Sequence, residues 1–125
     1  MRDAFAHEAM LMMPVDGDVR APGAAITVEL CGSWEHEPPC PVAPHHSQTE
    51  RLGDEVRLRV LFATESGHEA DVRARIDEAL AKGQLLGADG EVTVWQMTRS
   101  GPSLVETNEI QHARRLVNTP GARLD

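Results

Sequence analysis

Residues 55–82, EVRLRVLFATESGHEADVRARIDEALAK, decide the fold class of this chain. Apolar and polar side chains alternate over 55–63, and a period of two is typical of a half-buried strand. The period then changes, because apolar side chains recur every four residues and predict a helix over 66–82. These ridge residues are Val72, Ile76 and Leu80. A capping box that starts at Ser66 begins the helix, and Gly83 is a typical C-terminal stop.

Strands and helices on either side complete a small mixed fold. Clean alternation predicts a strand over 25–31, and a third strand is expected over 91–98. The last helix is expected over 103–118, although 103–106 could instead form a short return strand. The stretch 55–98 has the length of a crossover unit, so its two strands should be parallel or separated by one strand. The order strand, long loop, strand, helix, strand, helix predicts an α+β fold, a two-layer sandwich with helices on one face of a small sheet.

The chain is expected to form a single domain. Its 125 residues suffice for one core and are too few for two ordinary ones. Turn signals rich in proline and glycine predict a flexible N-terminal segment over 1–24. The domain then spans 25–118, contains a long loop over 32–54 that is rich in proline, cysteine and histidine, and is followed by a C-terminal tail over 119–125.

Composition argues against several classes of partner. Twelve basic and twenty acidic side chains give a net charge of −8, whereas nucleic acids and anionic membranes require clustered cations. No apolar run reaches the roughly 18 residues that a membrane span needs. His7 and Glu8 interrupt the apolar part of the N-terminus, which therefore does not match a signal peptide. We expect a cytoplasmic protein without a nucleic-acid or membrane partner.

The loop over 32–54 and its flank concentrate side chains that bind metals. Five of them follow the spacing C-x4-H-x3-C-x4-H-H: Cys31, His36, Cys40, His45 and His46. Thiolate and imidazole are the usual ligands of tetrahedral zinc, and copper(I), nickel or iron accept the same donors. Prolines between these residues would stiffen the loop and reduce the entropy that is lost when an ion binds. The pattern therefore predicts a Zn²⁺ or similar site.

Three interpretations of this cluster stay open. Both cysteines could bind an ion with one or two of the histidines, and Glu35 and Glu37 would then orient His36. The spacing lacks the C-x2-C pair of zinc fingers, so the loop could instead carry no ligand. The third alternative is a disulfide between Cys31 and Cys40, which a reducing cytoplasm disfavours.

The predicted sheet leaves one face uncovered. Trp95, Met97 and Leu61 are expected on that face, opposite the inward valine and leucine side chains. Exposed apolar surface of this kind usually marks a binding partner. We therefore expect a homodimer, or a protein partner that contacts the sheet face around Trp95.

These observations favour one functional class over two others. A nucleophile with a base and an orienting group is not recognisable, so an enzyme is not the leading interpretation, although metal-bound water at the loop would be reactive. The sequence favours a small cytosolic metal-binding α+β domain. The alternative is a non-catalytic, dimerising interaction or regulatory module that binds no metal.

Overall fold

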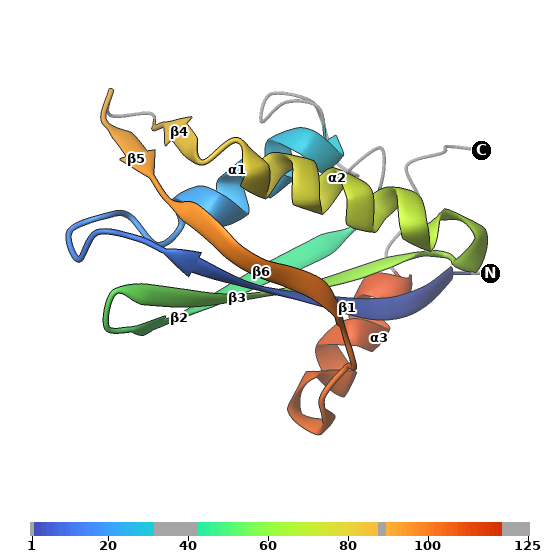
Figure 1. Ribbon diagram of the computed structural model, residues 1–125. Coiled ribbons are helices and arrows are strands. Elements are labelled where there is room, and N and C mark those ends of the chain that lie inside the picture. Colours follow the sequence, from blue (N-terminus) through green and yellow to red (C-terminus); the bar gives the residue numbers. More distant parts are fainter. Residues whose placement is uncertain (1, 32–42, 88–89, 119–125) are drawn as a thin grey trace.

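A computed structural model of the chain describes residues 2–31, 43–87 and 90–118. These residues form a four-stranded sheet, a two-stranded ribbon and three α-helices (Figure 1). The α+β class predicted from the sequence is therefore confirmed.

The elements follow the chain in this order: β1 Arg2–Met12, α1 Ala21–Cys31, β2 His45–Leu52, β3 Glu55–Glu65, α2 Glu69–Ala81, β4 Gln84–Leu86, β5 Val92–Val94, β6 Gln96–Ser103 and α3 Ile110–Asn118. Short 3-10 turns at Ser66–His68 and Thr107–Glu109 lead into α2 and α3.

The four strands of the large sheet lie in the order β2-β3-β1-β6, and all neighbours are antiparallel. Because β1 is antiparallel to both β3 and β6, those two strands run parallel with one strand between them. The crossover expected for 55–98 is thus confirmed in its one-strand-apart form. Two interleaved β-α-β units of this kind make the ferredoxin-like topology, which many unrelated functions share.

The sheet is covered on both faces. Helices α1 and α2 pack on one face, and α3 lies against β1 and β3 on the other (Figure 1). The large core lies under α1 and α2, whereas Leu61 and Ala63 of β3 contact Leu116 of α3 in a smaller cluster. The predicted placement of all helices on one face therefore differs from the structure. α3 packs on the second face because that face of β3 is also apolar and needs cover.

The N-terminal residues are the main correction to the predicted organisation. Residues 2–12, which were expected to be flexible, form the central strand β1 and pair with both β3 and β6. A strand that is buried on both faces has apolar residues on both, so its sequence lacks the clean alternation of a half-buried strand. Ala6, Ala9 and Leu11 are all buried, although they do not share one face.

Residues 25–31 form the second half of a helix rather than a strand. Ile26 and Leu30 lie one turn apart on α1 and are fully buried in the large core. Burial of this pair outweighs the few tenths of a kcal/mol that β-branched residues cost in a helix. At the start of the helix, a Cβ on Gly23 would lie 3.1 Å from the Cβ of Ser47, so glycine lets α1 approach β2 closely.

The other boundaries are partly as predicted. Gly83 adopts a φ of 71° and ends α2, and β3 covers the predicted strand. The predicted capping box at Ser66 is wrong, because residues 66–68 form a 3-10 turn without a side-chain cap. The third strand divides at Trp95 into β5 and β6. The last helix begins only after residue 106, with a capping box between Glu106 and Glu109.

The ridge of α2 provides the first prediction. Ile76 is fully buried between α2 and the sheet, so Ile76→Ala should lower the free energy of unfolding by about 2–4 kcal/mol in urea titrations. Glu78→Ala on the exposed side of the same helix is the matched control and should change it by less than about 0.5 kcal/mol. Equal losses in the two variants would contradict this packing.

Candidate functional site

The structure places part of the predicted Cys/His cluster. Cys31 is the last residue of α1, and His45 and His46 are the first two residues of β2. His36 and Cys40 lie outside the described residues, and so does the side chain of Cys31. The described parts show no group of three His, Cys, Asp or Glu side chains that could hold a metal ion. The five-residue set therefore stays a prediction.

His45 is held in one orientation by α1 and by its own backbone. Its Nδ1 lies 3.1 Å from the carbonyl oxygen of Ala43, which can only accept, so Nδ1 carries the proton. Its Nε2 lies 3.0 Å from the hydroxyl oxygen of Thr27 on α1. Burial lowers the pKa of His45, so the imidazole is neutral near pH 7, and its unprotonated Nε2 can accept the proton of the Thr27 hydroxyl.

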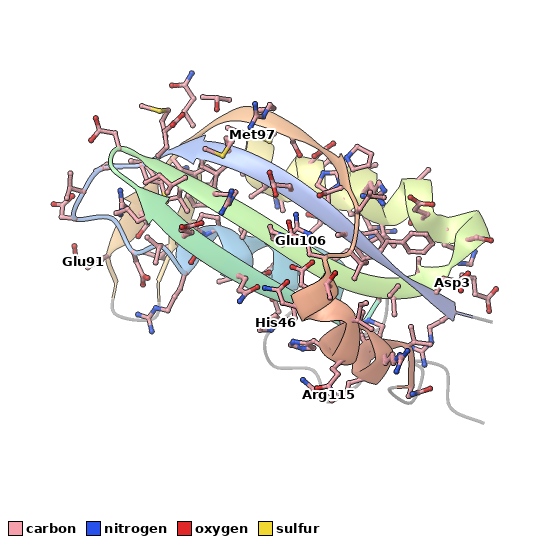
Figure 2. All side chains as sticks on the ribbon, turned by 90° about the horizontal axis from the view of Figure 1, so that it is seen from below. Asp3, His46, Glu91, Met97, Glu106 and Arg115 are labelled. Atoms are coloured by element: carbon pink, nitrogen blue, oxygen red, sulfur yellow. The ribbon has the colours of Figure 1, made fainter. Side chains whose placement is uncertain are left out.

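His46 lies on the opposite face of the sheet, because consecutive strand residues point to opposite sides. Figure 2 shows it beside α3, where its ring centroid is 4.1 Å from that of His112. Burial, with a smaller contribution from His112, lowers the pKa of His46. One ion at the α1 side of the sheet could therefore bind His45 but not His46, and the predicted pair is split.

A second polar cluster has the residue types of a hydrolase triad, and it was not recognised from the sequence. His7 of β1 is buried, and its Nε2 lies 3.1 Å from Asp77 Oδ1 and 2.8 Å from Ser100 Oγ. Ser100 donates to the same Asp77 oxygen at 2.5 Å. Arg73 Nη1 donates to His7 Nδ1 at 3.0 Å. The cluster joins β1, α2 and β6.

The geometry of this cluster does not suit nucleophilic catalysis. In a triad, the serine contacts one imidazole nitrogen and the carboxylate contacts the other. Here both contact Nε2 of His7, and Arg73 makes Nδ1 an acceptor, so the proton of the neutral ring is on Nε2. A protonated Nε2 cannot remove a proton from Ser100. The cluster is therefore a structural link between the strand and the helix.

A buried ion-pair cluster links the other face of the sheet to the turn before α3. Arg59 donates to both carboxylate oxygens of Glu109 at 2.9 and 2.8 Å, and to Glu8 at 2.7 Å. It also donates to Ser103 Oγ and the carbonyl of Leu104. These hydrogen bonds raise the pKa of Arg59 and lower that of Glu109, so both stay charged. The alternation over 55–63 predicts a half-buried strand with its polar residues on the exposed face, but Arg59, one of those polar residues, is buried.

The predicted partner surface around Trp95 is placed differently by the structure. Trp95 is only 5% exposed, belongs to the large core and donates its indole N–H to the carbonyl of Leu80 at 2.9 Å. Leu61 is covered by α3, and Met97, which Figure 2 labels, is half-buried. None of the three forms an open apolar sheet face. A partner as such stays a prediction.

Comparisons with known proteins add no family to this picture. No protein-family model matches the chain, and no curated protein matches its sequence. No helix within 2–31, 43–87 or 90–118 is long and apolar enough to cross a lipid bilayer.

The buried histidines predict a specific pH dependence. Burial lowers the pKa of His7, partly offset by Asp77, whereas an unfolded histidine titrates near 6.5. The unfolded chain therefore binds more protons below pH 6.5, and stability should fall as the pH decreases from 7 to 5.5. His7→Gln should flatten this slope in urea titrations by at most about 1.4 kcal/mol per pH unit. An unchanged slope would show that His7 titrates alike in both states.

Two arginines on one face of β3 provide a matched pair. Arg59→Ala leaves Glu109 buried without its partner and should cost about 3–5 kcal/mol of unfolding free energy. Arg57→Ala breaks only an exposed pair with Glu50 and should cost about 1 kcal/mol or less. Comparable losses would mean that the Arg59 cluster does not hold the turn before α3.

Proposed function

We propose that this chain binds one Zn²⁺ or a similar transition-metal ion through Cys31, His36, Cys40 and His45. One observation carries the proposal. The sequence between the last residue of α1 and the first residue of β2 contains two of these residues, and the other two, Cys31 and His45, stand at its ends. The contact between Thr27 and His45 brings that helix and that strand end side by side.

The position of His46 on the opposite face reduces five candidate ligands to four. The remaining spacing is C-x4-H-x3-C-x4-H, which supplies two thiolates and two imidazoles. Structural zinc takes four such ligands in a tetrahedron. Four protein ligands leave no position for a reactive water molecule, so the proposed site is structural rather than catalytic.

The surroundings of His45 support a role as a ligand. Histidines that bind metals commonly donate their other ring N–H to a carbonyl oxygen, which fixes the tautomer and aims the free nitrogen at the ion. His45 does this with Nδ1 and the carbonyl of Ala43. In the structure Nε2 faces the Thr27 hydroxyl, which would have to move aside for an ion to bind there. The carbonyl of Gly23, 3.2 Å from that hydroxyl, offers its proton another acceptor.

An ion at this position would connect α1 to β2 through the loop between them. The start of α1 lies close to β2, since a Cβ on Gly23 would lie 3.1 Å from the Cβ of Ser47. Binding to the folded state alone stabilises it by mass action, by about 4 kcal/mol when free metal is a thousand times the dissociation constant. The proposed function is thus to hold the fold in a metal-dependent form.

The adjacent histidines allow a sharp test. Protein purified without a histidine tag should contain about one zinc per chain by elemental analysis. His45→Gln and Cys40→Ser should lose the metal and melt at the temperature of the chelator-treated wild type. The matched control, His46→Gln, should keep the zinc, because this side chain lies on the other face.

Two results would contradict the proposal. One is a chelator-treated protein whose melting temperature and thiol reactivity do not change when zinc is added. The other is equal zinc loss in the His45→Gln and His46→Gln variants. Zinc binding should also weaken on acidification, because both thiols must lose a proton to bind the ion.

A further inference from the structure

The ribbon formed by β4 and β5 exposes an apolar face. Its register pairs Leu86 with Val92 and Gln84 with Val94, so these side chains share one side of the ribbon. Leu86, Val92 and Val94 are 63%, 55% and 48% exposed. On the other side, Leu85 packs against the large core. A two-stranded ribbon of three residues a strand is marginal in water by itself, and its apolar side has no cover among the residues that the structure describes.

One edge of β5 is unpaired among the residues that the structure describes, where β5 joins only β4. Gly87 donates its N–H to the carbonyl of Glu91, and Trp95 donates to the carbonyl of Gly83. Because backbone groups alternate between the two sides of a strand, those of Val92 and Val94 point away from β4. They form a short open edge on which a further strand can hydrogen-bond.

A groove lies beside this ribbon, between it and the start of α1. Its cavity volume is about 620 Å³, within the range of sites that hold a ligand. Leu85, Val92 and Val94 contribute apolar walls. The charged lining residues are Asp16, Asp18, Glu91 and Arg20. Arg20 pairs with Asp18, so the lining has an excess of negative charge. Figure 2 labels Glu91 at this end of the molecule.

We propose that an extended segment of a partner protein, with alternating apolar and basic side chains, binds here as an added strand on β5. Main-chain hydrogen bonds to Val92 and Val94 would set its direction, and alternate side chains would enter the groove. The negative lining favours basic side chains over acidic ones. A second copy of this chain fits less well, because each copy has a net charge of −8. This inference does not depend on the metal site.

The proposal can be tested with a defined probe. An acetylated and amidated seven-residue peptide of alternating lysine and valine should bind saturably in calorimetry, with a dissociation constant below about 1 mM. The affinity should fall when salt is added, because exposed charges are screened. The same peptide with glutamate in place of lysine, or with N-methylated amides on one edge, should bind at least about ten times more weakly.

Variants separate the apolar contribution to peptide binding from the electrostatic one. Val92→Thr combined with Val94→Thr keeps β-propensity and removes apolar surface, so binding should fall about ten-fold or more. Asp16→Asn should weaken the basic peptide about two- to five-fold and leave the glutamate peptide unweakened. Leu104→Thr is the control, since Leu104 is 85% exposed but lies in the connection between β6 and α3.

Three outcomes would overturn the proposal. The first is no saturable binding of the lysine-valine peptide up to about 1 mM. The second is equal binding of the glutamate peptide or of the N-methylated peptide. The third is a wild-type dimer in sedimentation that the double Val92→Thr, Val94→Thr variant converts to a monomer, which would assign the surface to a second copy.

Discussion

Two consecutive polar side chains in the middle of the central strand, His7 and Glu8, determine where helices can pack on this sheet. β1 lies between β3 and β6, helices cover both faces of the sheet, and neighbouring residues of the strand point to opposite faces. A buried polar group must find hydrogen-bond partners, or it costs stability. On one face, Asp77 of α2 meets the imidazole. On the other, Arg59 joins Glu8 to Glu109, just before α3. Each helix is thus tied to the centre of the sheet.

Elements with one buried and one exposed side are predicted well from the sequence. α2 falls into this class, and its period and the stop at Gly83 are as predicted. β3 and its crossover relation to β6 are also as predicted, because Arg57 and Arg59 alternate with apolar residues even though most of its second face is buried. Two other elements are missed. β1 lacks alternation because both faces are covered, and α1 contains strand-forming residues such as Ile26 whose burial decides their conformation. Local periodicity does not report contacts with a strand or helix far along the chain.

The candidate site, too, is predictable from the sequence only in part. The residue types and spacing that favour zinc can be taken directly from the sequence. The sequence does not show on which face of the sheet His45 and His46 lie, because 32–54 was expected to be one loop without a strand. Once both are known to begin β2, strand geometry assigns them to opposite faces. The cluster around His7 joins residues 70 and 93 positions apart, and only the tertiary fold brings them together. The open edge of β5 likewise depends on where the chain turns after α2.

The most direct measurement of the central claim is X-ray absorption at the zinc edge of metal-loaded protein. A site made of Cys31, His36, Cys40 and His45 predicts a first shell of two sulfur atoms at about 2.3 Å and two nitrogen atoms at about 2.0–2.1 Å. The His46→Gln variant should give the same spectrum, since that side chain lies beside His112 on the other face of the sheet. A shell without sulfur, or a spectrum that changes in the His46→Gln variant, would contradict this assignment.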